Sequence, residues 1–268
     1  IATRLDYYYF QGTNEDSVIH YTNKVKEFAK ATHQPKYYYF AWANRLVTYY
    51  LKTSRTNIAL YEVQNMLKEA HDKSGLSRCY NIMSQIYTIK RFDSMAFEWR
   101  LKEIELTEKY NIENYNISQT YAQIANYYIS QKKQKEALRA VEKAISTANS
   151  STQQISAKLE YVNYYSKFGD FQAAEKILKE CQIAFEQDKR LESIKKRLYN
   201  IECLYYQQTR QYQKALEAAE MQEKEEHRLS ESILSSSHYR TQGEIYQKMG
   251  NMNMAVKYLQ MYINTDDS

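Results

Sequence analysis

The stretch NYYISQKKQKEA, from Asn126 to Ala137, decides the fold, because its spacing recurs along the chain. Within it, Tyr128 is followed nine residues later by Ala137. Successive tyrosines of this kind are 37 to 41 residues apart, which indicates an array of repeats. The same nine-residue interval occurs six times, at Tyr50 and Ala59, Tyr87 and Ala96, Tyr128 and Ala137, Tyr165 and Ala174, Tyr206 and Ala215, and Tyr246 and Ala255.

The composition favours helices throughout the chain. Among 268 residues there are one proline and five glycines, far below the average usage of roughly 5% and 7%. Few residues are therefore available for hairpin turns or flexible linkers, and β structure is not expected. With 43% hydrophobic residues the chain can bury a large apolar surface, which a repeat array spreads along its axis.

Helical patterns come in pairs, each pair forming one unit. The first unit begins with an aromatic segment, Tyr7 to Phe10, before a helix whose start is signalled by Asp16 and Ser17. Pro35 can begin the next helix without the loss of a backbone hydrogen bond. The apolar stripe of the first helix comprises Val18, Tyr21, Val25, Phe28 and Ala29. We expect one array with units at residues 1–34, 35–75, 76–114, 115–151, 152–188, 189–230 and 231–268.

The last repeat resembles the tetratricopeptide repeat (TPR) family. The segment YRTQGEIYQKMGNMNMAVKYLQMYI, from Tyr239 to Ile263, has Gly243 for close helix approach and Ala255 at the helix crossing. Its turn at Gly250, like the one at Gly169, suits the left-handed conformation of a helix C-cap. The resemblance implies an all-α fold: a right-handed superhelical solenoid of about seven antiparallel helix pairs. The fit is poorer where Arg100 and Glu103 occupy positions that should be apolar and Lys158 replaces an aromatic residue.

Long, tyrosine-rich repeats look like the sensor regions of bacterial two-component histidine kinases and related membrane-linked regulators, especially those of Bacteroidetes. The closing YINTDDS is similar to the stretch that precedes a coiled linker, a membrane helix and an output domain in such proteins. This resemblance implies a non-enzymatic sensory module, periplasmic or otherwise extracytoplasmic, that binds a peptide, protein or small ligand. The alternative is a freestanding cytoplasmic scaffold or co-chaperone. A reading frame that continues past Ser268 into an apolar span of ~20 residues favours the sensor, and a stop codon there favours the scaffold.

The candidate binding residues follow from helix geometry. In the family, positions six and two residues before the repeat tyrosine face a concave groove; at 100° per residue they lie about 120° or more from the tyrosine. An asparagine amide there can donate to and accept from a peptide backbone, although simple solvation of an exposed helix face is the competing interpretation. We expect alanine at both Asn126 and Asn163 to weaken ligand binding without lowering thermal stability. The predicted ligand-binding residues are Asn44, Asn81, Gln85, Asn126, Asn163, Asn200 and Arg240.

The doubled tyrosines have two interpretations. They could form an aromatic platform for sugars or bases. Packing is favoured instead, because the first tyrosine of a pair is rotated by only 100° from the buried one and can contact the neighbouring repeat. The pairs are Tyr49 with Tyr50, Tyr127 with Tyr128, Tyr164 with Tyr165 and Tyr205 with Tyr206.

No motif for catalysis, a cofactor or a metal is evident. A Gly-rich phosphate loop, a nucleophile elbow and paired catalytic carboxylates are all missing from the sequence. Phosphatases of the peptide-pheromone type are also built from such repeats, but no catalytic glutamine can be identified here. The three cysteines lack metal-ligand spacing, and the five histidines are spread over four units without a pair at ligand spacing on one helix. Cys181 and Cys203 are expected to be core thiols, with a disulfide between them as the alternative.

The charge pattern bears on partners. Thirty-seven basic and 32 acidic residues give a net charge of +5 without a long basic stripe, so nucleic acid is not an expected partner. No apolar run approaches the ~20 residues of a membrane span, so this fragment is not expected to contact the membrane directly. A peptide or protein in the concave groove is the expected partner, and a homodimer is left open.

Overall fold

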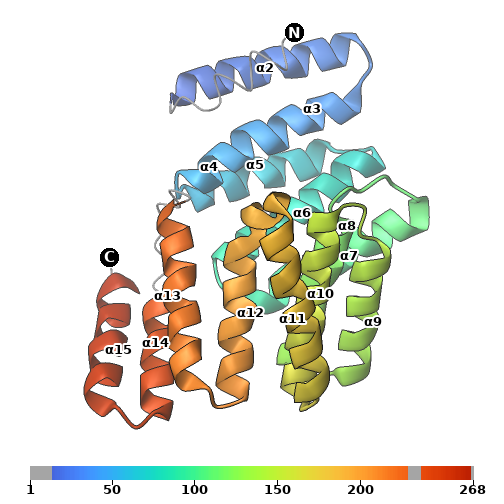
Figure 1. The fold of residues 1–268 in the computed structure, drawn as a ribbon. Helices are drawn as coiled ribbons and strands as arrows, with labels where there is room; N and C mark the ends of the chain where they lie inside the picture. The colour runs from blue at the N-terminus through green and yellow to red at the C-terminus, as the bar shows by residue number, and fades with distance from the viewer. Residues whose placement is uncertain (1–13, 229–236, 267–268) are drawn as a thin grey trace. The chain divides into compact units, whose positions relative to one another are not determined.

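A computed structural model describes residues 14–228 and 237–266, and every regular element within those ranges is a helix (Figure 1). The predicted all-α class is therefore confirmed. The predicted aromatic segment from Tyr7 to Phe10 lies outside the described residues. The chain divides into two compact units, residues 1–114 and 115–268, and each is considered by itself.

Unit 1 consists of consecutive helices joined by short turns. Pro35 occupies the first turn of α3, as predicted. A π-helical segment, η1, interrupts the long helix that α3 begins and α4 ends. The elements are α2 (Glu15–Ala31), α3 (Pro35–Ala41), η1 (Trp42–Val47), α4 (Thr48–Lys52), α5 (Thr56–Glu69), α6 (Lys73–Ile89) and α7 (Asp93–Tyr110).

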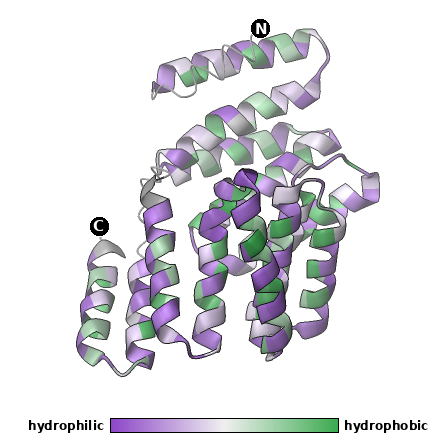
Figure 2. Ribbon diagram, viewed as in Figure 1, coloured by the Kyte–Doolittle hydropathy of each residue, from purple (hydrophilic) through white to green (hydrophobic). Residues whose placement is uncertain are grey.

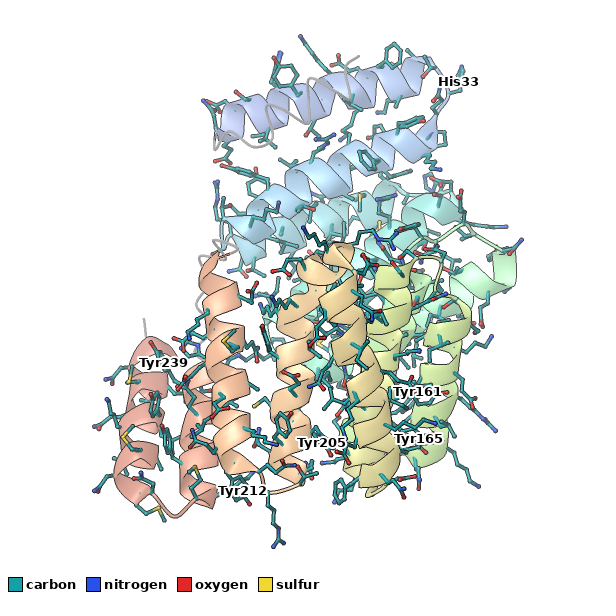
Figure 3. All side chains as sticks on the ribbon, in the orientation of Figure 1. His33, Tyr161, Tyr165, Tyr205, Tyr212 and Tyr239 are labelled. Carbon is teal, nitrogen blue, oxygen red and sulfur yellow. The ribbon has the colours of Figure 1, made fainter. Side chains whose placement is uncertain are left out.

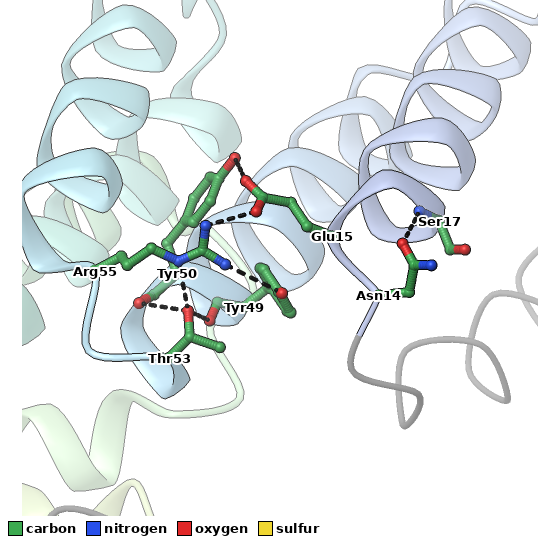
Figure 4. Close-up of polar contacts among 7 residues, drawn as sticks. All are labelled: Asn14, Glu15, Ser17, Tyr49, Tyr50, Thr53 and Arg55. Carbon is green, nitrogen blue, oxygen red and sulfur yellow. Dashed lines mark hydrogen bonds and ion pairs between the residues drawn. The ribbon is translucent and has the colours of Figure 1, made fainter.

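Helix α2 is attached to the rest of unit 1 by polar contacts at its start (Figure 4). Glu15 forms an ion pair with Arg55 at 2.6 Å and accepts a hydrogen bond from the Tyr50 hydroxyl at 3.2 Å. The helix begins at Asn14, whose side chain accepts from the Ser17 backbone N–H at 3.3 Å, so the predicted start at Asp16 and Ser17 was slightly late.

One member of the predicted apolar stripe of α2 is wrong. Val18, Val25 and Ala29 are buried, but Phe28 is 66% exposed. At 100° per residue, Phe28 lies about 80° from Val18, at the edge of the narrow stripe. Thr22, about 40° from Val18, is buried in that stripe instead.

Unit 2 repeats a helix-pair plan. The first helices α8, α10 and α12 contact one another in sequence, and each packs against the helix that follows it. The 3-10 segment η2 leads into α12. The elements are α8 (Ile117–Ser130), α9 (Gln134–Ser146), α10 (Ser151–Phe168), α11 (Phe171–Gln187), η2 (Lys189–Ile194), α12 (Lys195–Gln208), α13 (Tyr212–Arg228), α14 (Ser237–Lys248) and α15 (Met252–Asp266).

The turn inside each complete pair has one conformation. The residue four positions after the repeat tyrosine has φ between 57° and 89°, and the next backbone N–H donates to the tyrosine carbonyl at 2.8–2.9 Å. This is the hydrogen bond of a left-handed helix cap. The prediction for Gly169 and Gly250 is confirmed, but the other four turns reach the same conformation without glycine. The six left-handed residues are Ser54, Arg91, Lys132, Gly169, Arg210 and Gly250.

All six crossing alanines are buried, with at most 3% exposure. The repeat tyrosine is less buried than predicted: only Tyr50 is fully buried, and the other five are half-buried. In five of the six pairs the residue just before the tyrosine is buried, so that position, and not the tyrosine, points most directly into the core. Figure 2 shows how hydrophobic and hydrophilic residues interleave along the helices. The buried preceding residues are Tyr49, Ile86, Tyr164, Tyr205 and Ile245.

The cysteines are buried free thiols, as predicted for Cys181 and Cys203, so the alternative disulfide is not formed. Burial raises the pKa of Cys181 to about 11. Within the described ranges, no helix is both long and apolar enough to cross a membrane.

Candidate ligand-binding site

The structure brings some of the predicted binding residues together and leaves others apart. Asn81 and Gln85 meet on α6, and Asn126 on α8 meets Asn163 on α10. Exposed Asn200 lies on α12 and makes neither of these contacts. On α14, Arg240 donates from Nε to Glu244 Oε1 at 2.8 Å. Asn44 belongs to η1, and its side chain is outside the described part of the structure.

The amides of unit 2 surround a buried carboxylate. Glu160 on α10 has 0% side-chain exposure and pairs with Arg197 on α12. Its Oε1 accepts from Asn126 Nδ2 at 3.1 Å, and its Oε2 accepts from Asn163 Nδ2 at 3.5 Å. Asn163 Nδ2 also donates to Asn126 Oδ1 at 2.6 Å. We call these four side chains the Glu160 network.

The Glu160 network fixes three neighbouring helices. A buried carboxylate without partners costs several kcal/mol, so Glu160 requires the donors that α8, α10 and α12 supply. Burial lowers the pKa of Arg197 to about 10, so the guanidinium remains charged at neutral pH and the ion pair persists. The relative positions of the three first helices are therefore specified by polar as well as apolar contacts.

The Glu160 network leaves hydrogen-bonding groups for a ligand. The exposed side chain of Asn126 uses one N–H toward Glu160 and its carbonyl toward Asn163, which leaves a second N–H. Asn163 directs its amide nitrogen to both partners and keeps its carbonyl oxygen. The second N–H of Asn126 and the carbonyl oxygen of Asn163 can therefore pair with the carbonyl oxygen and the N–H of a peptide backbone.

A small cleft adjoins Arg197. Its volume is about 180 Å³, below the ~300 Å³ at which pockets begin to enclose a drug-sized ligand. The cleft can hold one side chain of a larger partner, and it lies near the beginnings of α8, α10 and α12. It is lined by Ser118, Gln119, Ala122, Thr152, Gln153, Ser156, Ala157, Ile194 and Arg197.

Unit 1 has a second buried carboxylate, Glu103 on α7, which is 1% exposed. Asn81 Nδ2 donates to both of its oxygens at 3.2 Å, and Asn114 Nδ2 donates to Oε1 at 2.9 Å. Gln85 Nε2 in turn donates to Asn81 Oδ1 at 2.7 Å. We call these four side chains the Glu103 network.

The poor family fit at Arg100 and Glu103 now has a structural explanation. Both side chains are buried, as the repeat pattern requires of their positions, but they satisfy that burial with polar contacts. Arg100 Nη2 donates to Thr88 Oγ1 at 2.6 Å, while Glu103 accepts the amides of its network. Departures from the family pattern therefore mark the polar network of unit 1.

The doubled tyrosines belong mostly to the packing between helices. Tyr49, Tyr164 and Tyr205 are buried, as the packing interpretation predicts, and Tyr127 is half-buried. In Figure 3, Tyr161 and Tyr165 lie one turn apart on α10, and their rings stack with centres 5.7 Å apart.

In the part of the chain that the structure describes, no group of three histidine, cysteine, aspartate or glutamate side chains is placed to hold a metal ion.

Sequence reasoning missed Glu160 and Arg197. For Glu160 the sequence held a signal, because this residue lies five positions before its repeat tyrosine. At the same position, two other repeats have the buried residues Ile82 and Ile201. A charge at that position must be buried too, because it lies one turn before the core residue that precedes the tyrosine. Glu160 and Arg45 are the two charged residues there, and both are buried.

Comparison with known proteins identifies the fold. No protein-family model and no curated protein sequence matches the chain. Among solved structures, apo RapI matches with a TM-score of 0.71 and 14% identity, covering 99% of this chain and 96% of that one. The fold is TPR-like. At this level of identity the similarity establishes the fold alone.

Two further solved structures support the TPR-like assignment. NprR, solved in complex with its cognate peptide NprX, has a TM-score of 0.67 and 12% identity, with 98% of this chain and 76% of that chain covered. A tetratricopeptide repeat protein from Parabacteroides merdae has a TM-score of 0.60 and 14% identity, with 98% and 91% covered. In this fold α8, α10 and α12 are each the first helix of a pair, so the Glu160 network joins the first helices of three successive pairs.

Proposed function

We propose that this chain is a non-enzymatic module that binds an extended peptide or protein segment along the first helices of its repeats. The observation that carries the proposal is the Glu160 network, which holds a spare amide N–H of Asn126 next to a spare carbonyl oxygen of Asn163. A peptide backbone can satisfy both groups whatever its side chains are. The peptide complex of NprR supports the proposal by analogy of fold.

In finer detail, we propose that the module senses its ligand for a bacterial signal-transduction protein, as an extracytoplasmic region of a membrane-linked regulator. This part rests on the resemblance of the long, tyrosine-rich repeats to such sensor regions. The alternative is a freestanding scaffold or co-chaperone in the cytoplasm. Sequencing the gene beyond the codon for Ser268 separates the two: a coiled segment and an apolar span support the sensor, and a stop codon supports the scaffold.

A peptide-binding experiment tests the first part. Purified protein is mixed with a pool of fluorescein-labelled synthetic peptides of random sequence, and the affinity of captured peptides is measured by fluorescence anisotropy. Gln85→Ala in unit 1 with Asn200→Ala in unit 2 covers a peptide bound by either unit, and the double variant should weaken binding about fivefold, because one lost neutral hydrogen bond contributes about 0.5–1.5 kcal/mol. Neither side chain donates to a buried carboxylate, so both substitutions should spare stability.

The matched control is Asn253→Ala with Gln260→Ala, which removes two exposed amides from the outer helix α15. Affinity should be unchanged in that control. Failure of the pool to bind, or equal affinity in both double variants, would contradict the proposal. Asn126 and Asn163 are less suitable probes than the sequence suggested: both donate to buried Glu160, so we now expect their replacement to lower thermal stability as well.

A further inference from the structure

Positive charge in unit 2 is concentrated at the turns inside its helix pairs. Each turn segment is the run of eight residues between a repeat tyrosine and its crossing alanine, and the four segments together contain seven basic and two acidic residues. The rest of residues 115–268 contains 14 basic and 17 acidic residues. The turns are therefore strongly basic in a unit that is otherwise net acidic. The four segments are residues 129–136, 166–173, 207–214 and 247–254.

The fold brings these four segments to one side of unit 2. In Figure 1 the turns from α8 to α9, α10 to α11, α12 to α13 and α14 to α15 lie along the lower edge of the unit. The last two segments also touch, since Lys248 Nζ donates to Gln207 Oε1 at 3.0 Å. We call the four segments the basic edge. Its basic residues are Lys132, Lys133, Lys135, Lys167, Arg210, Lys214 and Lys248.

The protein itself does not neutralise the basic edge. All seven basic side chains are exposed, and none forms an ion pair with a described residue. Lys214 comes closest, because its charge contributes to the lowered pKa of Glu175, but Glu175 is already paired with Lys179 at 2.7 Å. Elsewhere in the described part of unit 2, at least six lysine and arginine side chains do form ion pairs. The edge thus presents its cations to an external partner.

Exposed apolar side chains lie among these cations. Phe171 is 40% exposed, Met249 42% and Met252 59%, and all three belong to turn segments. Cations beside exposed apolar groups suit the surface of an anionic bilayer, where basic groups meet the headgroups and apolar groups enter the boundary with the acyl chains. A nucleic acid or an acidic peptide would use the cations but not the apolar groups. The combination therefore favours a lipid surface.

We propose that the basic edge docks unit 2 on the surface of an anionic lipid membrane. The lysines contact the headgroups, and Phe171, Met249 and Met252 enter the boundary beneath them. We expected no direct membrane contact because an apolar run of spanning length is lacking, but a protein can lie on a bilayer without spanning it. The inference goes beyond the proposed function and does not depend on it, since the Glu160 network has no member in the turn segments.

Vesicle sedimentation with the full chain tests the proposal. The probes are vesicles of phosphatidylcholine and phosphatidylglycerol in equal parts, and vesicles of phosphatidylcholine alone. We expect saturable binding to the anionic vesicles that weakens as salt is added, and little binding to the neutral ones. The edge variant carries Lys132→Gln, Lys133→Gln and Lys135→Gln. It should bind at least tenfold more weakly, because each basic residue near such a surface contributes about fivefold.

The matched control variant carries Lys143→Gln, Lys189→Gln and Lys224→Gln. It removes the same charge from exposed positions near the ends of α9 and α13 and in η2, at the opposite end of the helix pairs, so it should still bind the anionic vesicles tightly. All six lysines are exposed, so both variants should fold, which circular dichroism checks.

A fluorescent label tests whether the apolar groups enter the bilayer. Met252→Cys is labelled with an environment-sensitive thiol dye, and the three native cysteines are buried and should not react. Its emission should shift to the blue with anionic vesicles. The same label on Ser193→Cys, at an exposed position in η2, should not shift.

Several outcomes would overturn the inference: equal binding to neutral vesicles, an equal loss in the edge and control variants, or no emission shift at the label on Met252→Cys. Duplex DNA or polyglutamate that binds as tightly as the anionic vesicles, and more weakly to the edge variant, would also overturn it, because the edge would then bind soluble polyanions. Peptides captured from the random pool should bind the edge variant with unchanged affinity, so failure of either proposal is seen separately.

Discussion

The two units bury a glutamate in different ways. In unit 2, Glu160 belongs to a first helix and is neutralised by Arg197 from the next first helix, with amides from two helices completing its contacts. In unit 1, Glu103 belongs to a second helix and accepts from the neutral amides of Asn81 and Asn114, while its charge attracts Arg100 of the same helix. Both buried carboxylates therefore combine amide donors with a nearby arginine, but that arginine comes from the next first helix in unit 2 and from the same helix in unit 1.

Two arginines at equivalent positions also differ in their partners. Arg197 on α12 and Arg78 on α6 each lie nine residues before a repeat tyrosine, but only Arg197 has a carboxylate partner within the described residues. A half-buried cation without an acceptor lowers stability, whereas a paired one is tolerated. Replacement by methionine is therefore expected to lower the stability of the protein at Arg197 but not at Arg78.

The largest effect is expected for Arg197→Met. Methionine preserves apolar volume but leaves Glu160 as a buried carboxylate without a counter-charge, which should lower the free energy of unfolding by about 3 kcal/mol. Urea denaturation followed by circular dichroism measures this loss. Arg139→Met, at an exposed position on α9, is the matched control and should change stability little. A loss no larger than that of the control would show that the ion pair does not balance Glu160.

An intermediate effect is expected for Glu103→Gln. Glutamine keeps the shape but loses one acceptor and the negative charge, so the hydrogen bonds from Asn81 and Asn114 weaken by about 1–2 kcal/mol in total. The same change at Glu160 should cost more, because it also breaks the direct ion pair with Arg197 that joins two helices. Paired denaturation curves of the two variants measure the difference. Equal losses would mean that the ion pair adds nothing to the amide contacts.

The smallest effect is expected for Arg78→Met. Removal of a half-buried cation without an acceptor should leave stability unchanged or raise it by up to about 1 kcal/mol. Differential scanning calorimetry alongside Arg197→Met tests the predicted opposite signs directly. A clear loss of stability at Arg78 would instead indicate that its contact with the Phe40 ring, 5.6 Å away, stabilises unit 1.

The repeat spacing was enough to predict the fold class. Six tyrosine–alanine intervals located the crossings, and all six alanines are buried because only a small side chain fits where two helices approach closely. The direction of the core was predicted one residue too late. Tyrosine is large and amphipathic, so the repeat tyrosine keeps part of its ring at the surface while the residue before it, such as Ile86 or Ile245, is fully buried.

The candidate site was only partly predictable. The amides of Asn81 and Asn126 were identified from their helix positions, but their partners were not, because Glu103 lies 22 residues from Asn81 and Glu160 lies 34 residues from Asn126. Contacts over that distance depend on how neighbouring repeats are packed. Periodicity predicts which positions are buried, but it does not show which charged side chains meet there.

The shared turn conformation has a consequence for how such a chain can evolve. Each turn closes with the same hydrogen bond from the backbone to the carbonyl of the repeat tyrosine, whether its left-handed residue is Gly169, Ser54 or Lys132. Main-chain atoms define the junction, so its geometry does not depend on which repeats it joins. Recombination at these points can duplicate, delete or exchange helices and preserve every backbone hydrogen bond of the turn, while the networks at Glu103 and Glu160 restrict which helices can become neighbours.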